Sequence, residues 1–392
     1  MKVRGESINF SDKLLILLLF FSAFASLFSD SLNRIALYVA VPIAFLLTIN
    51  KIKSLRVNRY TNCLFFLFGW ITLSYLWTVY QDPAKVELHR VLGAFLLSYI
   101  MAGNARNIKL IPWLYIVYIV LYLGAWYYVS QHIIVDVSAM NNEMDRLNDA
   151  KLNANTMAYY TFFATYTIYI LGIIYSNRMC GRIANILFLF TIPLSFYVAL
   201  TTASRQVLLI QIPLISLLMY DRYLKGEKIV KKMFFFVLCL LVLFFSYSYI
   251  LSMYENSYLA VRVSGDLKDD ARTNLLFDAL DVGFKHFPLG VGAGNYIMYS
   301  YNHHFSHNSF VEVFVNQGIV GFLLYFSLLF IFVRKQFNRY RYSHDRMYWV
   351  FGIFGIIYII DSFFYVFFTD LWLISFFILV ATHSETYYIN KK

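Results

Sequence analysis

The chain has 392 residues and a formal net charge of +11, and 60% of its residues are hydrophobic whereas only 14% are charged. Soluble domains are about half apolar and roughly a quarter charged, so this composition excludes an ordinary soluble protein. Many apolar runs approach the ~20 residues that cross a bilayer. The sequence therefore predicts an all-α, polytopic helical membrane protein.

Twelve membrane-spanning helices are expected, in chain order, at residues 13–28, 35–49, 60–80, 89–103, 110–129, 157–175, 183–200, 207–220, 233–251, 310–333, 347–367 and 371–383. The fourth, eighth and twelfth runs are short for a full crossing, so each could be a tilted, partly buried or re-entrant segment. Residues 1–392 are expected to form a single integral membrane domain.

The loops between these runs alternate in charge. Most Lys and Arg residues fall on the side that carries the amino terminus, from Lys2 and Arg4 through Lys231 and Lys232 to Lys391. Positive residues concentrate in short cytoplasmic loops, so a multi-pass protein with both termini in the cytoplasm is expected. Contact with anionic lipid headgroups then explains the net charge, and no nucleic-acid partner is needed.

Two segments on the outward side are too long to be turns, namely residues 130–156 and residues 252–309. In the second, residues 271–286 place apolar side chains at helical spacing, for example Leu275, Ala279 and Gly283. This spacing predicts a short amphipathic helix that lies on the membrane or over the bundle. Long ordered loops usually carry function, so both segments are candidate site loops.

His307 lies where the second outward segment meets the tenth apolar run, together with Asn308 and Glu312. A histidine at a membrane interface can be a passive amphipathic anchor. An ionisable residue at this depth is costly, however, and imidazole suits general-base chemistry near neutral pH. Asn308 and Glu312 would then fix the imidazole tautomer or hold substrate hydroxyls. His303 and His304 suggest a metal site with His307, but their spacing fits no known zinc pattern, so no metal is expected.

Two outward arginines are candidate anion ligands, because a guanidinium fork matches phosphate oxygens. Arg205 lies in a short outward turn between the seventh and eighth runs, where contact with a lipid headgroup is the alternative. Arg272 opens the expected amphipathic helix, where an ion pair with Asp269 or Asp270 is the alternative. Asp361 lies within a span and either pairs inside the bundle or supports a site.

Four short motifs occur in order between residues 146 and 325. The first is Asn-Ala-Asn-Thr-Met-Ala at residues 153–158, and the second is Thr-Ala-Ser-Arg, which ends at Arg205. The third is Arg272 followed by Pro-Leu-Gly-Val-Gly-Ala-Gly at residues 288–294. The fourth is His-Asn-Ser-Phe from His307, with Glu312 and the glycines at 318 and 321 behind it. In this order the motifs resemble the O-antigen ligase and O-antigen polymerase family of bacterial membrane glycosyltransferases.

The resemblance implies a reaction at the periplasmic face of the bacterial inner membrane, in O-antigen or other surface polysaccharide assembly. A glycan leaves polyprenyl (undecaprenyl) diphosphate and joins a hydroxyl of an acceptor sugar, with inversion and without a metal or other cofactor. His307 would orient or deprotonate that hydroxyl, and Arg205 and Arg272 would stabilise charge on the diphosphate. The expected substrate-binding residues are Asn308, Glu312, Arg146 and Asn155. Ala271 and Ala293 stand where the family usually has glycine, and both departures are small.

Two kinds of enzyme share these motifs. A polymerase adds the growing chain to a new lipid-linked repeat unit, whereas a ligase transfers the finished chain to lipid A-core. We favour the polymerase because such enzymes are the more numerous and varied. Membrane lipids, a chain-length regulator and a flippase are the other partners implied. A transporter of the same lipid-linked sugars is the distant alternative, but transporters usually carry repeats and midplane charges, which this sequence does not show.

Overall fold

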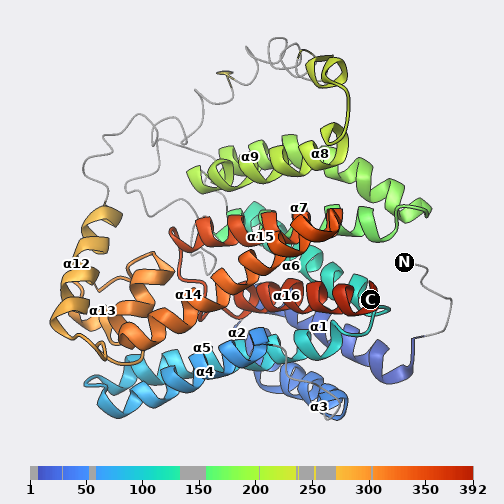
Figure 1. Ribbon diagram of the computed structural model, residues 1–392. Coiled ribbons are helices and arrows are strands. Elements are labelled where there is room, and N and C mark those ends of the chain that lie inside the picture. The colour runs from blue at the N-terminus through green and yellow to red at the C-terminus, as the bar shows by residue number, and fades with distance from the viewer. Residues whose placement is uncertain are drawn as a thin grey trace. The chain divides into compact units, whose positions relative to one another are not determined.

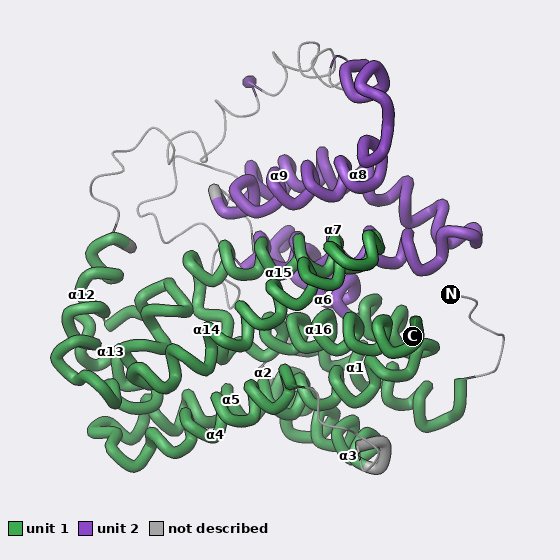
Figure 2. Tube along the Cα trace, viewed as in Figure 1, with its two compact units in different colours: residues 1–117, 267–392 green, residues 118–266 purple. Residues whose placement is uncertain are grey.

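The computed structural model describes residues 8–52 except 29, 59–132, 156–234 except 203, 237, 251–252, and 271–391 except 302. Every regular element in these residues is a helix, as the sequence predicts. The chain forms two compact units: unit 1 comprises residues 1–117 and 267–392, and unit 2 comprises residues 118–266 (Figure 2).

Unit 1 is a helical bundle in which the two ends of the chain pack together (Figure 1). Helix α5 (Gln81–Asn104) packs against α16 (Leu371–Lys391), and α4 (Arg59–Leu73) packs against α14 (Ser309–Ser343), so segments far apart in sequence share one core. The other helices of unit 1 are α1 (Phe10–Phe28), α2 (Asp30–Ile35), α3 (Val41–Ile52), α12 (Ala271–Lys285), α13 (Tyr296–Tyr299) and α15 (Arg346–Ser362), with a π-helical turn at Ala36–Ala40 and a 3-10 turn at Ser74–Trp77.

Unit 2 is built around α7 (Thr156–Ile174), whose side chains are almost all buried. Helices α8 (Met179–Thr202) and α9 (Arg205–Met219) pack against α7 and against each other, and a π-helical turn at Tyr220–Leu224 follows. The Tyr169 hydroxyl of α7 donates to the Asp221 carboxylate at 2.6 Å, which ties α7 to this turn. Helix α6 (Ile111–His132) begins in unit 1 and continues into unit 2.

Seven described helices are long and apolar enough to cross a membrane, and they coincide with the expected second, fourth, fifth, sixth, seventh, eighth and tenth spans. The expected first, third, eleventh and twelfth spans are also helical, as α1, α4, α15 and α16. Most of the ninth span, most of the loop at residues 130–156, and residues 253–270 lie outside the described residues. The total of twelve spans and the side on which each loop lies remain predictions.

Two helices extend well beyond the runs from which they were expected. Helix α5 begins at Gln81 rather than at residue 89, and α14 continues to Ser343 rather than ending at residue 333. These ends carry charged residues, which hydropathy excludes from a span. At the carboxyl end of α14, both terminal nitrogens of Arg339 donate to the Glu385 carboxylate of α16 at 2.9 Å, and Lys335 donates to it at 2.9 Å. A bidentate ion pair between helices therefore supports the charged end.

Replacing Arg339 with Ala is expected to lower the free energy of unfolding by about 1–3 kcal/mol, because the half-buried Glu385 carboxylate loses its bidentate partner. Thermal unfolding of the detergent-solubilised protein, followed by intrinsic fluorescence, measures this loss. Arg334→Ala is the matched control, since Arg334 is exposed on the same helix, and it should change stability by less than about 0.5 kcal/mol. Equal losses in the two variants would contradict the assignment.

Candidate active site

Helix α14 is broken at Gly318, whose backbone has φ 64° and ψ −162°. The break leaves backbone groups without their partners in the helix, and residues 288–294, called the glycine turn here, supply most of the replacements. Val291 N donates to Val315 O at 2.9 Å, and Gly292 N donates to Asn316 O at 2.9 Å. Pro288 O accepts from the Ile319 amide at 3.0 Å. The indole N–H of Trp70 donates to Gln317 O at 2.8 Å, so the buried backbone around the break is satisfied.

The glycines of two separate sequence motifs meet at this break. A Cβ atom on Gly318 would lie 2.0 Å from Pro288 O, and a Cβ atom on Gly290 would lie 2.6 Å from Gly318 N. Both residues also have positive φ, which side chains other than glycine rarely adopt. The third and fourth motifs are therefore two halves of one packed structure. Ala293 is fully buried and is not among the residues with positive φ, which explains why alanine is tolerated there.

His307 lies in the loop between α13 and α14, called the histidine loop here, which is held in place by the start of α14. The Asn308 side chain caps this helix and accepts from the amides of Phe310 and Val311 at 3.0 and 3.1 Å. The buried Glu312 carboxylate accepts from Ser306 N at 2.8 Å. His307 itself is half-buried and has φ 54°, a left-handed conformation that is uncommon outside glycine. The hydrogen bonds on either side of His307 hold this strained conformation, as is typical of functional sites.

Asn316 connects the histidine loop to the glycine turn. Its side-chain NH₂ donates to the Glu312 carboxylate at 2.9 Å, and its side-chain oxygen accepts from Tyr296 N at 2.9 Å. Glu312 in turn holds Ser306, next to His307. A chain of hydrogen bonds thus runs from Tyr296, just after the glycine turn, to Ser306, which directly precedes His307. Such fully satisfied networks make a site rigid.

Helix α12, which carries Arg272 near its amino end, is joined to the same network. The Tyr296 hydroxyl donates to Asp278 Oδ2 at 3.0 Å and lies 3.1 Å from Leu275 O. Burial raises the pKa of Tyr296, and the hydrogen bond to Asp278 adds to this shift, so the hydroxyl stays protonated and remains a donor. Ala279 packs in an apolar cluster with Val291, Tyr296 and Val315. The expected amphipathic helix is present, and it lies over α14 (Figure 1).

Arg205 belongs to unit 2, where it is the first residue of α9. The next residue, Gln206, is buried and accepts from the Tyr159 hydroxyl of α7 at 2.9 Å. Tyr159 directly follows the Asn-Ala-Asn-Thr-Met-Ala motif at residues 153–158. The residues that directly follow the first and second motifs therefore contact each other within unit 2.

The structure brings some of the expected site residues together. His307, Asn308 and Glu312 form one loop and helix start in unit 1, joined by hydrogen bonds to the helix that contains Arg272. Arg205 lies in the other unit. Arg146 and Asn155 lie outside the described residues. Asp361 is fully buried in α15, and within the described part of the chain its carboxylate oxygens have no hydrogen-bond partner.

Three residues of the network were not expected from the sequence, namely Ser306, Asn316 and Tyr296. Asn316 could have been identified from the sequence, because an amide side chain buried in an otherwise apolar span must find hydrogen-bond partners. His303 and His304 are exposed, and the described residues contain no group of three or more His, Cys, Asp or Glu side chains placed to hold a metal ion.

Comparison with known proteins identifies the segment that contains three of the four motifs. A family model described as O-antigen ligase matches residues 187–326, which include Arg205, Arg272, the glycine turn, His307 and the break at Gly318. No curated protein matched the chain. Over residues 187–326 this chain is therefore similar to the O-antigen ligase family, which is the family that its motifs resemble.

Proposed function

We propose that this chain is a membrane glycosyltransferase of O-antigen or other surface polysaccharide assembly. It moves a glycan from polyprenyl diphosphate to a hydroxyl of an acceptor sugar at the periplasmic face of a bacterial membrane. The observation that carries the proposal is the fixed, left-handed His307 within the segment that matches the O-antigen ligase model. The network through Glu312, Asn316 and Tyr296 supports it, because that network joins His307 to the helix that contains Arg272.

The reaction needs a base and a means of stabilising the leaving group. The His307 imidazole takes the proton of the acceptor hydroxyl, and the hydroxyl oxygen forms a bond to the anomeric carbon. The bond from that carbon to the diphosphate oxygen breaks, and the electron pair stays on the diphosphate. Attack from the opposite side inverts the anomeric centre. Arg205 and Arg272 stabilise the diphosphate as permanent cations, so no metal ion is required.

Asn308 and Glu312 act as positioning residues in this proposal. Asn308 Oδ1 and both carboxylate oxygens of Glu312 already accept hydrogen bonds from the protein. The sequence left open whether they fix the imidazole or hold sugar hydroxyls, and these hydrogen bonds support a role in holding the backbone on either side of His307. Contact of Arg146 and Asn155 with substrate stays a prediction.

Reconstitution tests the function directly. Purified protein in phospholipid vesicles is supplied with the lipid-linked repeat unit of the producing bacterium and an acceptor glycan. Release of polyprenyl diphosphate together with a new glycosidic bond is expected, and NMR of the product should show inversion at the anomeric carbon. Activity should persist in EDTA. Movement of the donor across the vesicle membrane without a new bond would overturn the proposal in favour of a transporter.

The acceptor separates the two enzyme types, and we favour the polymerase. A deletion strain is expected to attach a single repeat unit to its lipid A-core, because ligation continues without polymerisation. Electrophoresis of the extracted lipopolysaccharide distinguishes this pattern from complete loss of added sugars, which would identify a ligase instead.

A further inference from the structure

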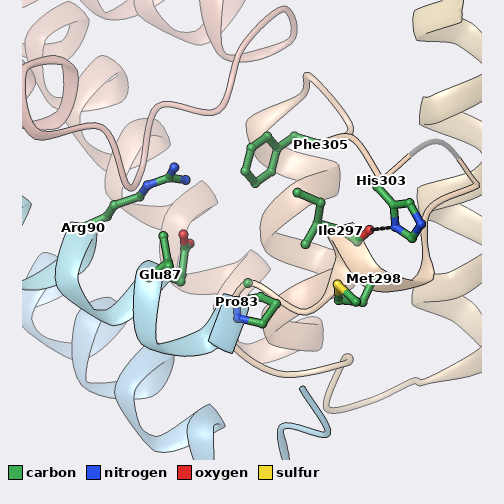
Figure 3. Close-up of a pocket in the computed structure, with 9 residues that line it drawn as sticks. Pro83, Glu87, Arg90, Ile297, Met298, His303 and Phe305 are labelled. Carbon is green, nitrogen blue, oxygen red and sulfur yellow. Dashed lines mark hydrogen bonds between the residues drawn. The ribbon is translucent and has the colours of Figure 1, made fainter. Parts of the chain in front are cut away.

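A cavity of about 480 Å³ lies in unit 1 beside the histidine loop (Figure 3). Its walls come from the first turns of α5, from Gly294 at the end of the glycine turn, and from residues that follow it. The lining residues include Pro83, Val86, Glu87, Arg90, Ile297 and Phe305. Pockets of this size hold small organic ligands, and a few polar groups in a mostly apolar wall set their orientation.

The cavity is built from segments that are fixed to each other. The Asn295 side chain accepts from Tyr80 N and donates to Tyr80 O, both at 2.8 Å, which joins the loop to the start of α5. A Cβ atom on Gly294 would lie 2.9 Å from Pro83 O and from the Glu87 Cβ, so the loop packs closely on this helix. The walls are therefore held by the same glycine turn that supports the histidine loop.

The cavity and His307 share one loop. Phe305 lines the cavity, Ser306 is held by the Glu312 carboxylate, and His307 follows. A ligand in the cavity would thus lie against the loop that carries His307, the residue that the proposed function assigns to the acceptor hydroxyl.

Two side chains of opposite charge line the cavity, one helical turn apart on α5. Glu87 is 5% exposed, and its carboxylate has no hydrogen bond or ion pair with any described residue. The Arg90 guanidinium lies 5.7 Å from the centre of the Phe305 ring and likewise has no ion pair among the described residues. Figure 3 shows both side chains on the α5 side of the cavity. A buried carboxylate without hydrogen bonds is costly even with Arg90 one helical turn away on α5, so a polar ligand that supplies hydrogen-bond donors would stabilise it.

The chemistry of the walls selects a sugar. A carboxylate accepts hydrogen bonds and a guanidinium donates them, so the two groups together satisfy neighbouring hydroxyl groups of a sugar. Pro83, Val86 and Ile297 give apolar surface for the C–H face of a ring. Glu87 and Arg90 carry opposite charges, so this wall attracts a diphosphate less than two arginines would, and the buried Glu87 carboxylate disfavours an aliphatic lipid tail.

We propose that this cavity is the acceptor subsite, in which Glu87 and Arg90 bind the terminal sugar of the acceptor and turn its hydroxyl toward His307. This inference rests on the proposed function and adds to it the residues that bind the acceptor sugar and determine its specificity. Glu87 and Arg90 lie on α5, outside the segment that matches the family model.

Kinetics with matched variants on one helix test the subsite. Glu87→Gln and Arg90→Gln are each expected to raise the acceptor KM by about 10- to 100-fold, as loss of a hydrogen bond to a charged group does, and to leave the donor KM unchanged. Asp82→Asn and Lys85→Gln are the controls, because these residues form an exposed ion pair on α5 at 3.4 Å and do not line the cavity. Both controls should keep wild-type constants.

A binding measurement separates this inference from the proposed function. Calorimetry without donor uses repeat-unit oligosaccharides prepared from the producing bacterium's own surface polysaccharide. Wild-type protein should bind them, and Arg90→Gln and Val86→Trp should not, since the second fills the cavity. If the wild type transfers glycan and both charge variants keep its acceptor KM, the subsite is wrong and the function stands. If the wild type transfers nothing yet binds oligosaccharide through Arg90, the function is wrong and the subsite stands. Arg90-dependent binding of polyprenyl phosphate in place of oligosaccharide would overturn the subsite.

Discussion

His307→Asn is expected to reduce glycan transfer by about 10²- to 10⁴-fold, the usual range for loss of a general base. Asparagine is the informative replacement because it tolerates the left-handed backbone conformation, φ 54°, that His307 adopts. Alanine would add backbone strain to the loss of the imidazole. The turnover number for polyprenyl diphosphate release, measured at saturating donor and acceptor, reports the effect.

The neighbouring histidine serves as the control for that experiment. His304 is exposed and does not line the cavity beside the loop, so His304→Asn should keep wild-type turnover. Both variants should melt at the wild-type temperature in detergent. A folded His307→Asn protein with wild-type turnover would exclude a catalytic role for the imidazole.

Gly318→Ala is expected to abolish transfer and to lower the melting temperature by many degrees. The φ and ψ of Gly318, 64° and −162°, lie in a region that only glycine occupies readily. The added Cβ would also lie 2.0 Å from Pro288 O, a backbone atom that cannot move without releasing the glycine turn. Strain alone costs about 1–3 kcal/mol, and loss of the hydrogen bonds across the break adds to it.

Gly69→Ala provides the comparison for this substitution. Gly69 lies within α4, and a Cβ atom there would meet nothing within 4 Å. Alanine favours a helix by roughly 0.5–1 kcal/mol over glycine, so this variant should be active and at least as stable as the wild type. If Gly318→Ala instead matches the wild type in melting temperature and transfer, the break does not hold the site together.

The helices could be predicted from the sequence because long apolar runs leave few alternatives to a membrane helix. The charged ends of α5 and α14 could not be predicted in this way, since a hydropathy argument ends a span at its first charged turn. Helix α5 was expected from residue 89, and the omitted turns contain Glu87. The carboxyl end of α14 was omitted for the same reason, and its support by Glu385 depends on a helix that lies far away in sequence.

The residues of the candidate site could be predicted from the sequence, but most of the hydrogen bonds that join them could not. His307 and its neighbours were evident from their place at the end of the second outward segment. The contact between Asn316 and Tyr296 joins two segments only through the fold, as does the contact between Tyr159 and Gln206. The break at Gly318 lies in an apolar run that reads as continuous helix, because its partners in the glycine turn are distant in the chain.

The break in α14 also bears on how this region folds. The piece from Ser309 to Gln317 makes only about two and a half turns, and the backbone groups at its broken end need partners within the protein. Its last carbonyl groups are satisfied by the glycine turn and Trp70 rather than by a following helical turn. This piece and the glycine turn must therefore order together. The histidine loop therefore reaches its functional conformation only when this whole region folds, in one cooperative step.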